Sequence, residues 1–123
     1  MEQEGANVVA IVDDDEDVGA VLKGLLEAMG YSAVSYKSGP EFLADAPFDR
    51  LGCLVIDQNM PQMTGIDLLT RLNEDGIFIP TLLITGQSDA GVRERAVDLG
   101  VMTVLEKPMS SQELLSFVAF SLG

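Results

Sequence analysis

Five short apolar runs alternate along this chain with longer segments whose apolar residues recur every three or four positions. The runs cover residues 8–12, 32–36, 53–56, 81–84 and 101–105. Such alternation predicts an α/β fold, in which a helix follows each strand of a parallel sheet. Continuous apolar runs predict strands buried on both faces, whereas the second run alternates polar with apolar residues, which predicts an edge strand.

Helix signals fill the segments between these runs. In chain order, the expected helices cover residues 18–29, start at Ser38, cover residues 65–73 and 88–99, and start at Ser110. Ser38 and Ser110 each stand three residues before a glutamate, which is the spacing of a capping box at a helix start. Gly30 and Gly100 follow their helical segments and are natural stops.

Residues 1–123 fit one domain. The chain is 47% hydrophobic, which is enough for a core and too much for a disordered protein. Five consecutive βα units fit a doubly wound, five-stranded parallel sheet with five helices on its faces, and the order expected for a small sheet of this class is 2-1-3-4-5. In this topology the functional site lies at the carboxyl ends of the strands. The residues that follow each strand are therefore the candidates for a site.

The charge of the chain is strongly negative. With 20 acidic and 7 basic residues, its formal net charge is −13. Because basic stripes dominate the affinity of nucleic-acid-binding surfaces, we expect no direct binding to nucleic acid, and none to an anionic membrane. No stretch is long and apolar enough to span a membrane, and the acidic start Met1–Glu4 is unlike a signal peptide. These features predict a cytoplasmic protein.

The sequence holds one cysteine and no histidine. Cys53 lies inside an apolar run, so a buried structural thiol is favoured over a reactive one, and no disulfide can form within the chain. The lack of histidine excludes Ser/His and Cys/His catalysis and the usual zinc sites. It also means that any phosphohistidine donor must be another protein.

Polar residues follow four of the five runs. They are Asp13-Asp14-Asp15, Asp57, Thr85-Gly86 and Glu106-Lys107-Pro108. Since the carboxyl ends of parallel strands meet at one edge of a sheet, we expect a crevice lined by carboxylates, a hydroxyl and an ammonium. Clustered carboxylates repel one another unless a cation compensates, and Mg²⁺ takes carboxylate and phosphate oxygens. The crevice is therefore typical of a Mg²⁺ site with room for a phosphoryl group.

The residues of this crevice suit phosphoryl transfer. Asp57 can attack phosphorus as a carboxylate nucleophile and form an acyl phosphate. Such transfer needs mainly positioning and charge neutralisation, which Mg²⁺ supplies on one side and Lys107 on the other. The hydroxyl of Thr85 can donate a hydrogen bond to a phosphoryl oxygen.

Each of these residues has a simpler interpretation when taken alone. Asp15 and Asp17 are assigned to the start of a helix, where acids favour the helix dipole. Thr85 followed by glycine fits a turn, and Lys107 fits an ordinary surface lysine. The functional interpretation depends on their joint placement at the ends of different strands.

Four motifs carry a family resemblance. They are Ile11-Val12-Asp13-Asp14-Asp15, Val55-Ile56-Asp57-Gln58-Asn59-Met60-Pro61-Gln62-Met63-Thr64-Gly65, Ile84-Thr85-Gly86 and Glu106-Lys107-Pro108. Together and in this order they resemble the receiver domain of response regulators in two-component systems, over essentially the whole chain. They are similar in particular to the nitrogen-fixation transcription-regulator type. The resemblance implies a flavodoxin-like signalling switch that is no enzyme beyond catalysing its own phosphorylation and dephosphorylation.

The resemblance assigns the acidic residues their roles. It implies that Asp57 is the phosphoacceptor, phosphorylated by a histidine kinase or a phosphotransfer protein. Asp14 and Asp57 would bind Mg²⁺ directly, and Asp13 would bind it through water. The main-chain carbonyl of Asn59 would be the third protein ligand. Mn²⁺ or Ca²⁺ can substitute for Mg²⁺ in such a site.

The resemblance also assigns roles around the phosphoryl group. Thr85 and Lys107 would sense it, and a cis peptide bond between Lys107 and Pro108 would aim the lysine into the site. Asn59 and Gln87 would line the path of the hydrolytic water. Replacing either would change the rate of dephosphorylation without abolishing phosphorylation.

One position departs from the family pattern. Receivers of this kind usually carry Tyr or Phe three residues before the lysine, where this chain has Val104. That ring turns inward when the threonine moves, and valine has no ring. We expect the phosphorylation chemistry to survive, and output to be weak or to run through a backbone shift after the fourth strand. Identical amide spectra of the two forms across residues 86–106 would contradict this hypothesis.

The resemblance implies an output domain or an effector protein as a second partner. It also allows a homodimer through the helix over residues 88–99, the run over residues 101–105 and the last helix. The chain fits both a single-domain regulator and the amino-terminal part of a longer transcription factor.

Three rival functions stay open on the sequence. A pseudo-receiver, which docks but is never phosphorylated, is kept open by Val104. A Mg²⁺-dependent aspartyl phosphatase would use a D-x-D pattern such as Asp13 and Asp15, but no insertion supplies a substrate cap. A flavin-binding protein of the same topology needs a Ser/Thr/Gly-rich phosphate loop, where this chain has acids that repel phosphate.

Overall fold

The computed structural model describes residues 6–86 and 90–122. Strands and helices alternate along this described chain, as the apolar runs predict. The strands are β1 (Val8–Val12), β2 (Ser32–Tyr36), β3 (Leu51–Asp57), β4 (Thr81–Thr85) and β5 (Thr103–Glu106). The α-helices are α1 (Glu16–Ala28), α2 (Gly39–Asp45), α3 (Gly65–Glu74), α4 (Ala90–Asp98) and α5 (Ser111–Leu122), and a short 3₁₀ helix, η1 (Phe48–Arg50), precedes β3.

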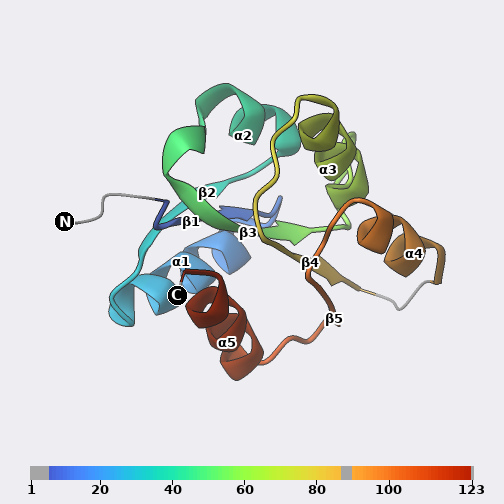
Figure 1. The fold of residues 1–123 in the computed structure, drawn as a ribbon. Coiled ribbons are helices and arrows are strands. Elements are labelled where there is room, and N and C mark those ends of the chain that lie inside the picture. Colours follow the sequence, from blue (N-terminus) through green and yellow to red (C-terminus); the bar gives the residue numbers. More distant parts are fainter. Residues whose placement is uncertain (1–5, 87–89, 123) are drawn as a thin grey trace.

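The sheet is parallel throughout, in the order β2-β1-β3-β4-β5. This confirms the predicted doubly wound, flavodoxin-like topology. Helices α2, α3 and α4 cover one face of the sheet, and α1 and α5 cover the other (Figure 1). The strand order reverses direction at β1, so the carboxyl ends of β1 and β3 flank the switch point where such folds place their sites.

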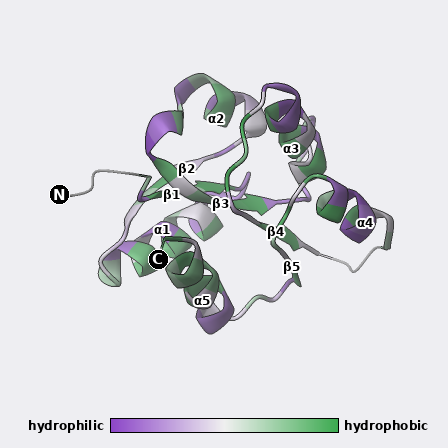
Figure 2. Ribbon diagram, viewed as in Figure 1, coloured by the Kyte–Doolittle hydropathy of each residue, from purple (hydrophilic) through white to green (hydrophobic). Residues whose placement is uncertain are grey.

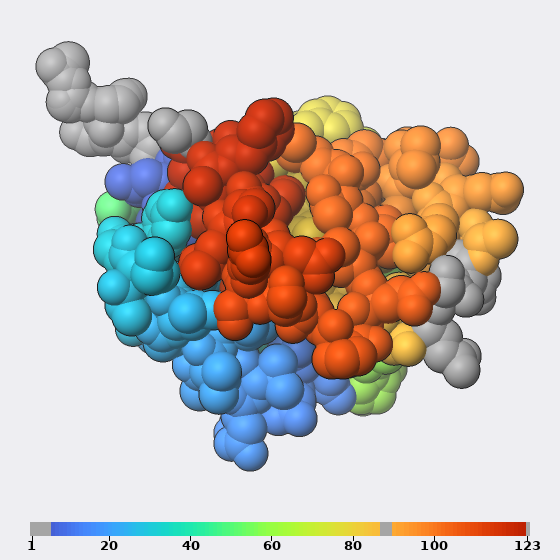
Figure 3. All heavy atoms as spheres, turned by 90° about the horizontal axis from the view of Figure 1, so that it is seen from below, coloured from blue at the N-terminus to red at the C-terminus, as the bar shows by residue number. Residues whose placement is uncertain are grey.

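Successive side chains of the central strands enter two apolar layers. Val9 and Ile11 of β1 face the layer of α1 and α5, where Cys53 is also fully buried. Burial raises the pKa of the Cys53 thiol to about 12, so the thiol is protonated at neutral pH and structural in character. In Figure 2 the central strands are largely hydrophobic, whereas α3 and α4 carry many hydrophilic residues, and Figure 3 shows α1 and α5 covering their face.

An aromatic cluster fills part of the opposite layer. The ring of Phe42 in α2 is fully buried and makes edge-to-face contacts with Tyr36 and Phe48, at centroid distances of 5.5 and 5.3 Å. The 3₁₀ helix η1, which no sequence signal predicts, presents Phe48 to this cluster. The end of β2 and the start of β3 are thereby packed against α2.

Two strands, β3 and β5, have bounds in the structure that differ from those predicted. β3 begins at Leu51 rather than at residue 53, because Gly52 interrupts the apolar pattern without interrupting the strand. β5 covers Thr103–Glu106 rather than residues 101–105, and it is half-buried rather than buried on both faces. The reason is its place at the sheet edge, where only β4 pairs with it among the described strands.

Both predicted capping signals begin a helix, in different ways. Ser110 and Glu113 form a complete capping box, since each side chain accepts the other residue's backbone N–H. Ser38 Oγ accepts the N–H of Glu41, but the Glu41 carboxylate accepts the N–H of Lys37 instead. The glutamate therefore ties down the end of β2 as well as the start of α2.

Candidate functional site

Three polar side chains are buried at the carboxyl edge of the sheet. Asp57 ends β3 and is 2% exposed, Asp13 directly follows β1 and is 5% exposed, and Thr85 ends β4 and is 3% exposed. Asp14 lies next to them and is exposed. The parallel register brings these strand ends together, because Val12 at the end of β1 pairs with Ile56 of β3, and Asp57 pairs with Ile84 of β4.

The carboxylates form a compact acidic cluster. Oxygens of Asp13, Asp14 and Asp57 all lie within 4.8 Å of one another. Lys107, directly after β5, brings its Nζ to 3.2 Å from both carboxylate oxygens of Asp57. The peptide bond between Lys107 and Pro108 is cis. The structure thus brings together the acids and the lysine that the sequence analysis placed at separate strand ends.

The buried position of Asp13 raises the pKa of its carboxyl group. Burial raises the pKa of this carboxyl above its ordinary value of 3.8, and repulsion from Asp57 and Asp14 raises it further. The backbone N–H of Asp15 donates to Asp13 Oδ1 at 2.9 Å and, with the charge of Lys107, acts in the opposite direction. Since burial dominates, the site holds negative charge in an unfavourable environment that a bound cation would relieve.

Backbone hydrogen bonds hold the loops around the cluster. The N–H of Gln58 donates to the carbonyl of Ile84 at 2.7 Å, and the N–H of Lys107 donates to the carbonyl of Thr85 at 2.8 Å. These bonds continue the ladders between β3, β4 and β5 past the last strand residues. The backbone positions of Asp57 and Lys107 are therefore held by these hydrogen bonds, independently of the contact between their side chains.

The cluster opens into a cavity of about 450 Å³. Asp13, Asp14, Asp57 and Lys107 form its polar side. Its apolar side includes Val18, Leu22 and Met109, which come from α1 and the loop after β5. The cavity gives the Asp57 carboxylate a path to a reactant although its residue is almost fully buried.

Comparison with known proteins identifies this arrangement. Residues 9–119 match the family described as the response regulator receiver domain. The chain belongs to this family. It is 34% identical over 117 residues to the response regulator protein TodT of Pseudomonas putida, covering 95% of this chain and 52% of TodT. It is 37% identical over 116 residues to the transcriptional regulatory protein FixJ of Azorhizobium caulinodans, covering 94% of this chain and 54% of FixJ.

The solved structures agree with this assignment. The structure of FixJ-N has a TM-score of 0.85 to the receiver domain described here, at 34% identity, over 99% of this chain and 95% of that one. The chain spans about half the length of the curated relatives it matches. Within residues 6–86 and 90–122, no helix is both long and apolar enough to cross a membrane.

The acidic cluster of this receiver domain fits a divalent cation. Receiver domains of this family are signalling modules of two-component systems and bind Mg²⁺ at an acidic aspartate cluster. Here three carboxylates, from Asp13, Asp14 and Asp57, offer oxygen ligands at short mutual distance. Oxygen ligands with excess negative charge are the donor set that Mg²⁺ prefers, so the residues present fit the ion.

Two further residues that the sequence singled out, Val104 and Gln87, lie outside the acidic cluster or outside the described residues. Val104 is half-buried in β5, pairs with Leu83 of β4 and packs against the apolar layer of α2, α3 and α4. A half-buried valine that packs against the core thus occupies the position where the family pattern has an aromatic ring. Gln87 lies outside the described residues.

Two residues after β3 have structural roles that the sequence analysis did not identify. Gln58 Oε1 accepts the N–H of Ile66 at 2.8 Å, so the residue after Asp57 caps the start of α3. A Cβ on Gly65 would lie 3.0 Å from the carbonyl oxygen of Asp57, so only glycine lets α3 approach β3 this closely. A glycine at a helix start was the available signal for this close approach.

Proposed function

We propose that this receiver domain is a phosphorylation-dependent switch in which Asp57 accepts a phosphoryl group from a partner histidine kinase or phosphotransfer protein. The observation that carries the proposal is the setting of Asp57. Its carboxylate is 2% exposed, lies within 4.8 Å of two further carboxylates, and is 3.2 Å from the Lys107 ammonium. Such a setting serves a reactive group better than a structural one.

The geometry supports nucleophilic attack by Asp57. A carboxylate oxygen forms the bond to phosphorus while the phosphorus–nitrogen bond of the donor phosphohistidine breaks, and the leaving imidazole keeps that electron pair and takes a proton from water. Lys107 neutralises charge on the transferred group, because its Nζ already touches both oxygens of the acceptor. Thr85, buried at the neighbouring strand end, donates its hydroxyl to a phosphoryl oxygen.

The divalent ion belongs to the same proposal. Asp14 and Asp57 would hold Mg²⁺ directly, Asp13 would hold it through water, and the main-chain carbonyl of Asn59 would complete the protein ligands. When bound, the ion neutralises the phosphoryl oxygens and offsets the repulsion among the aspartates. Mn²⁺ or Ca²⁺ would take the same oxygen ligands. Asn59 and Gln87 would tune the lifetime of the acyl phosphate.

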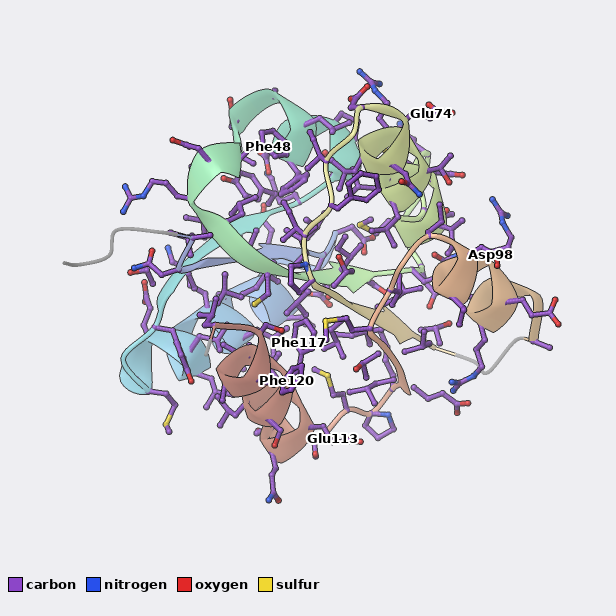
Figure 4. All side chains as sticks on the ribbon, viewed as in Figure 1. Phe48, Glu74, Asp98, Glu113, Phe117 and Phe120 are labelled. Carbon is purple, nitrogen blue, oxygen red and sulfur yellow. The ribbon has the colours of Figure 1, made fainter. Side chains whose placement is uncertain are left out.

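The surface near β5 supports an output role. Val97 of α4, Met102 before β5 and Phe120 of α5 are exposed apolar side chains, and Figure 1 places these elements on neighbouring parts of the molecule. Figure 4 labels Phe120 on α5, where it lines a surface pocket together with Met102 and Thr103. We propose that this face binds an output domain, an effector protein or a second copy, as part of a cytoplasmic signalling pathway.

Mass spectrometry tests the proposed chemistry. The protein is mixed with Mg²⁺ and acetyl phosphate beside the variants Asp57→Asn and Asp49→Asn, and the second is a matched control because Asp49 is an exposed residue of η1. A single phosphoryl adduct is expected on the wild type and on the control, and none on Asp57→Asn. An adduct that survives in Asp57→Asn contradicts the assignment of the acceptor.

The same experiment separates the rival functions. If no protein forms an adduct, the pseudo-receiver becomes the better description, and Val104 is the first residue to examine. Sustained release of phosphate from a generic phosphoester would instead favour the aspartyl phosphatase.

A further inference from the structure

The side chain of Asn59 connects the phosphoacceptor to the end of a different strand. Its backbone N–H donates to Asp57 Oδ1 at 3.0 Å, and its side-chain Oδ1 accepts the backbone N–H of Gly86 at 2.7 Å. A backbone N–H needs an acceptor, so the carbonyl end of the carboxamide must face Gly86. The short loop after β3 is thereby tied to the residue directly after β4.

This contact completes a closed ring of interactions at the sheet edge. The carbonyl of Thr85, next to Gly86, accepts the N–H of Lys107 at 2.8 Å. The Nζ of Lys107 returns to Asp57 at 3.2 Å. Within this ring the Asn59 contact is a bond between a neutral side chain and the backbone, made by an exposed residue that lines the same cavity as Asp57. It is therefore the contact in which the donor, the Gly86 N–H, most readily changes to another acceptor.

We propose that the Asn59 carboxamide is a latch that competes with the phosphoryl group for the Gly86 N–H. The proposal rests on the function proposed for Asp57. A charged phosphoryl oxygen is a stronger acceptor than a neutral carboxamide oxygen, because charge-assisted hydrogen bonds are about twice as strong. Phosphorylation of Asp57 then transfers the Gly86 N–H from Asn59 to the phosphoryl group and releases the link between the two loops.

The latch supplies a route from Asp57 to β4 that needs no aromatic ring. Val104 has no ring to move, whereas the bond from Asn59 to Gly86 acts directly on the backbone at the end of β4. The close approach also explains glycine at this position. A Cβ on residue 86 would lie 3.2 Å from Asn59 Oδ1, which is tighter than ordinary contact. Gly86→Ala therefore weakens the latch from the opposite side.

Amide hydrogen exchange tests the latch in the unphosphorylated protein. In Asn59→Ala, which keeps the main-chain carbonyl, the Gly86 amide should exchange at least about tenfold faster than in the wild type. Asn59→Asp keeps an acceptor oxygen and should preserve slow exchange. Asn73→Ala, which removes a carboxamide from α3, is the matched control and should leave Gly86 unchanged. Equal exchange at Gly86 in Asn59→Ala and the wild type overturns the latch.

Affinity for a phosphoryl mimic tests the competition. Beryllofluoride with Mg²⁺ is titrated into each protein and followed by NMR. Asn59→Ala should bind it about fivefold more tightly than the wild type, since one net hydrogen bond no longer has to be broken. Gly86→Ala should shift the affinity in the same direction. Equal or weaker binding by Asn59→Ala, with normal binding by the wild type, overturns the latch and leaves the proposed function intact. Failure of the wild type to bind beryllofluoride or to be labelled at Asp57 overturns the proposed function itself.

Discussion

The amino ends and the carboxyl ends of the strands form two rims of the sheet. The side chains buried at the amino rim are mostly apolar, whereas those buried at the carboxyl rim include charged groups. At the amino rim, Val8 and Leu51 are buried among apolar groups, and the buried hydroxyl of Thr81 donates to the carbonyl of Ile79 at 2.8 Å. At the carboxyl rim, Asp13 and Asp57 are equally buried but face further negative charge. The amino ends and the interior of the strands stabilise the fold, whereas the buried charges at the carboxyl ends, where the proposed reaction takes place, lower its stability.

The largest expected effect is in the strand interior. Leu54→Ala removes a fully buried side chain from β3 beside Thr81 and should lower the free energy of unfolding by about 3 kcal/mol. Urea unfolding followed by circular dichroism measures it. Val21→Ala on α1, where the side chain is 68% exposed, is the control and should change the free energy by about 0.5 kcal/mol or less. A loss below about 1 kcal/mol for Leu54→Ala would contradict the comparison.

A substitution at the carboxyl rim should have the opposite sign. Asp13→Asn keeps an oxygen that accepts the N–H of Asp15 and removes a buried charge. In EDTA at pH 7 it should raise the free energy of unfolding by an amount on the order of 1 kcal/mol. Saturating Mg²⁺ should reverse the order, because the ion stabilises the folded wild type in proportion to its binding. A destabilised Asp13→Asn in EDTA would remove the contrast between the two rims.

The pH dependence of this difference follows from the raised pKa of Asp13. Below the ordinary value of 3.8 the carboxyl is protonated in both folded and unfolded wild type, so the variant has no advantage. As the pH rises from 3.8 through the folded-state pKa, the unfolded state loses its proton first, and the wild type loses stability relative to Asp13→Asn. Urea unfolding of both proteins across this range in EDTA measures the divergence. An advantage that persists unchanged below pH 3.8 would show that charge is not its cause.

The smallest expected effect lies in the loop beside the site. Gln62 has a φ of 69°, a left-handed conformation that favours glycine. Gln62→Gly should raise the free energy of unfolding by about 0.5 kcal/mol, the relief of strain less the added entropy of the unfolded chain. Gln62→Ala keeps the strain and should not stabilise the protein. If both variants behave alike in urea unfolding, backbone strain at this rim is negligible.

Much of the fold follows from local patterns. The apolar runs predict all described strands to within two residues at each end, because a strand buried on both faces needs consecutive apolar side chains. The exceptions have tertiary causes. β5 is half-buried since it stands at the sheet edge, and η1 forms where Phe48 packs on Phe42. Neither the edge position nor the aromatic contact is visible in a window of neighbouring residues.

The candidate site divides in the same way. Residue types at strand ends predict which groups share the crevice, since parallel strands deliver their carboxyl ends to one edge. The sequence by itself thus determined where the strands lie along the chain and which acids, threonine and lysine follow them. Only the tertiary structure decided that Lys107 meets Asp57, that Asn59 caps the Gly86 N–H, that Gln58 holds α3, and that the pKa of Asp13 is raised. The physical reason is distance: hydrogen bonds and charge interactions depend on ångström-scale separations between residues far apart in the chain.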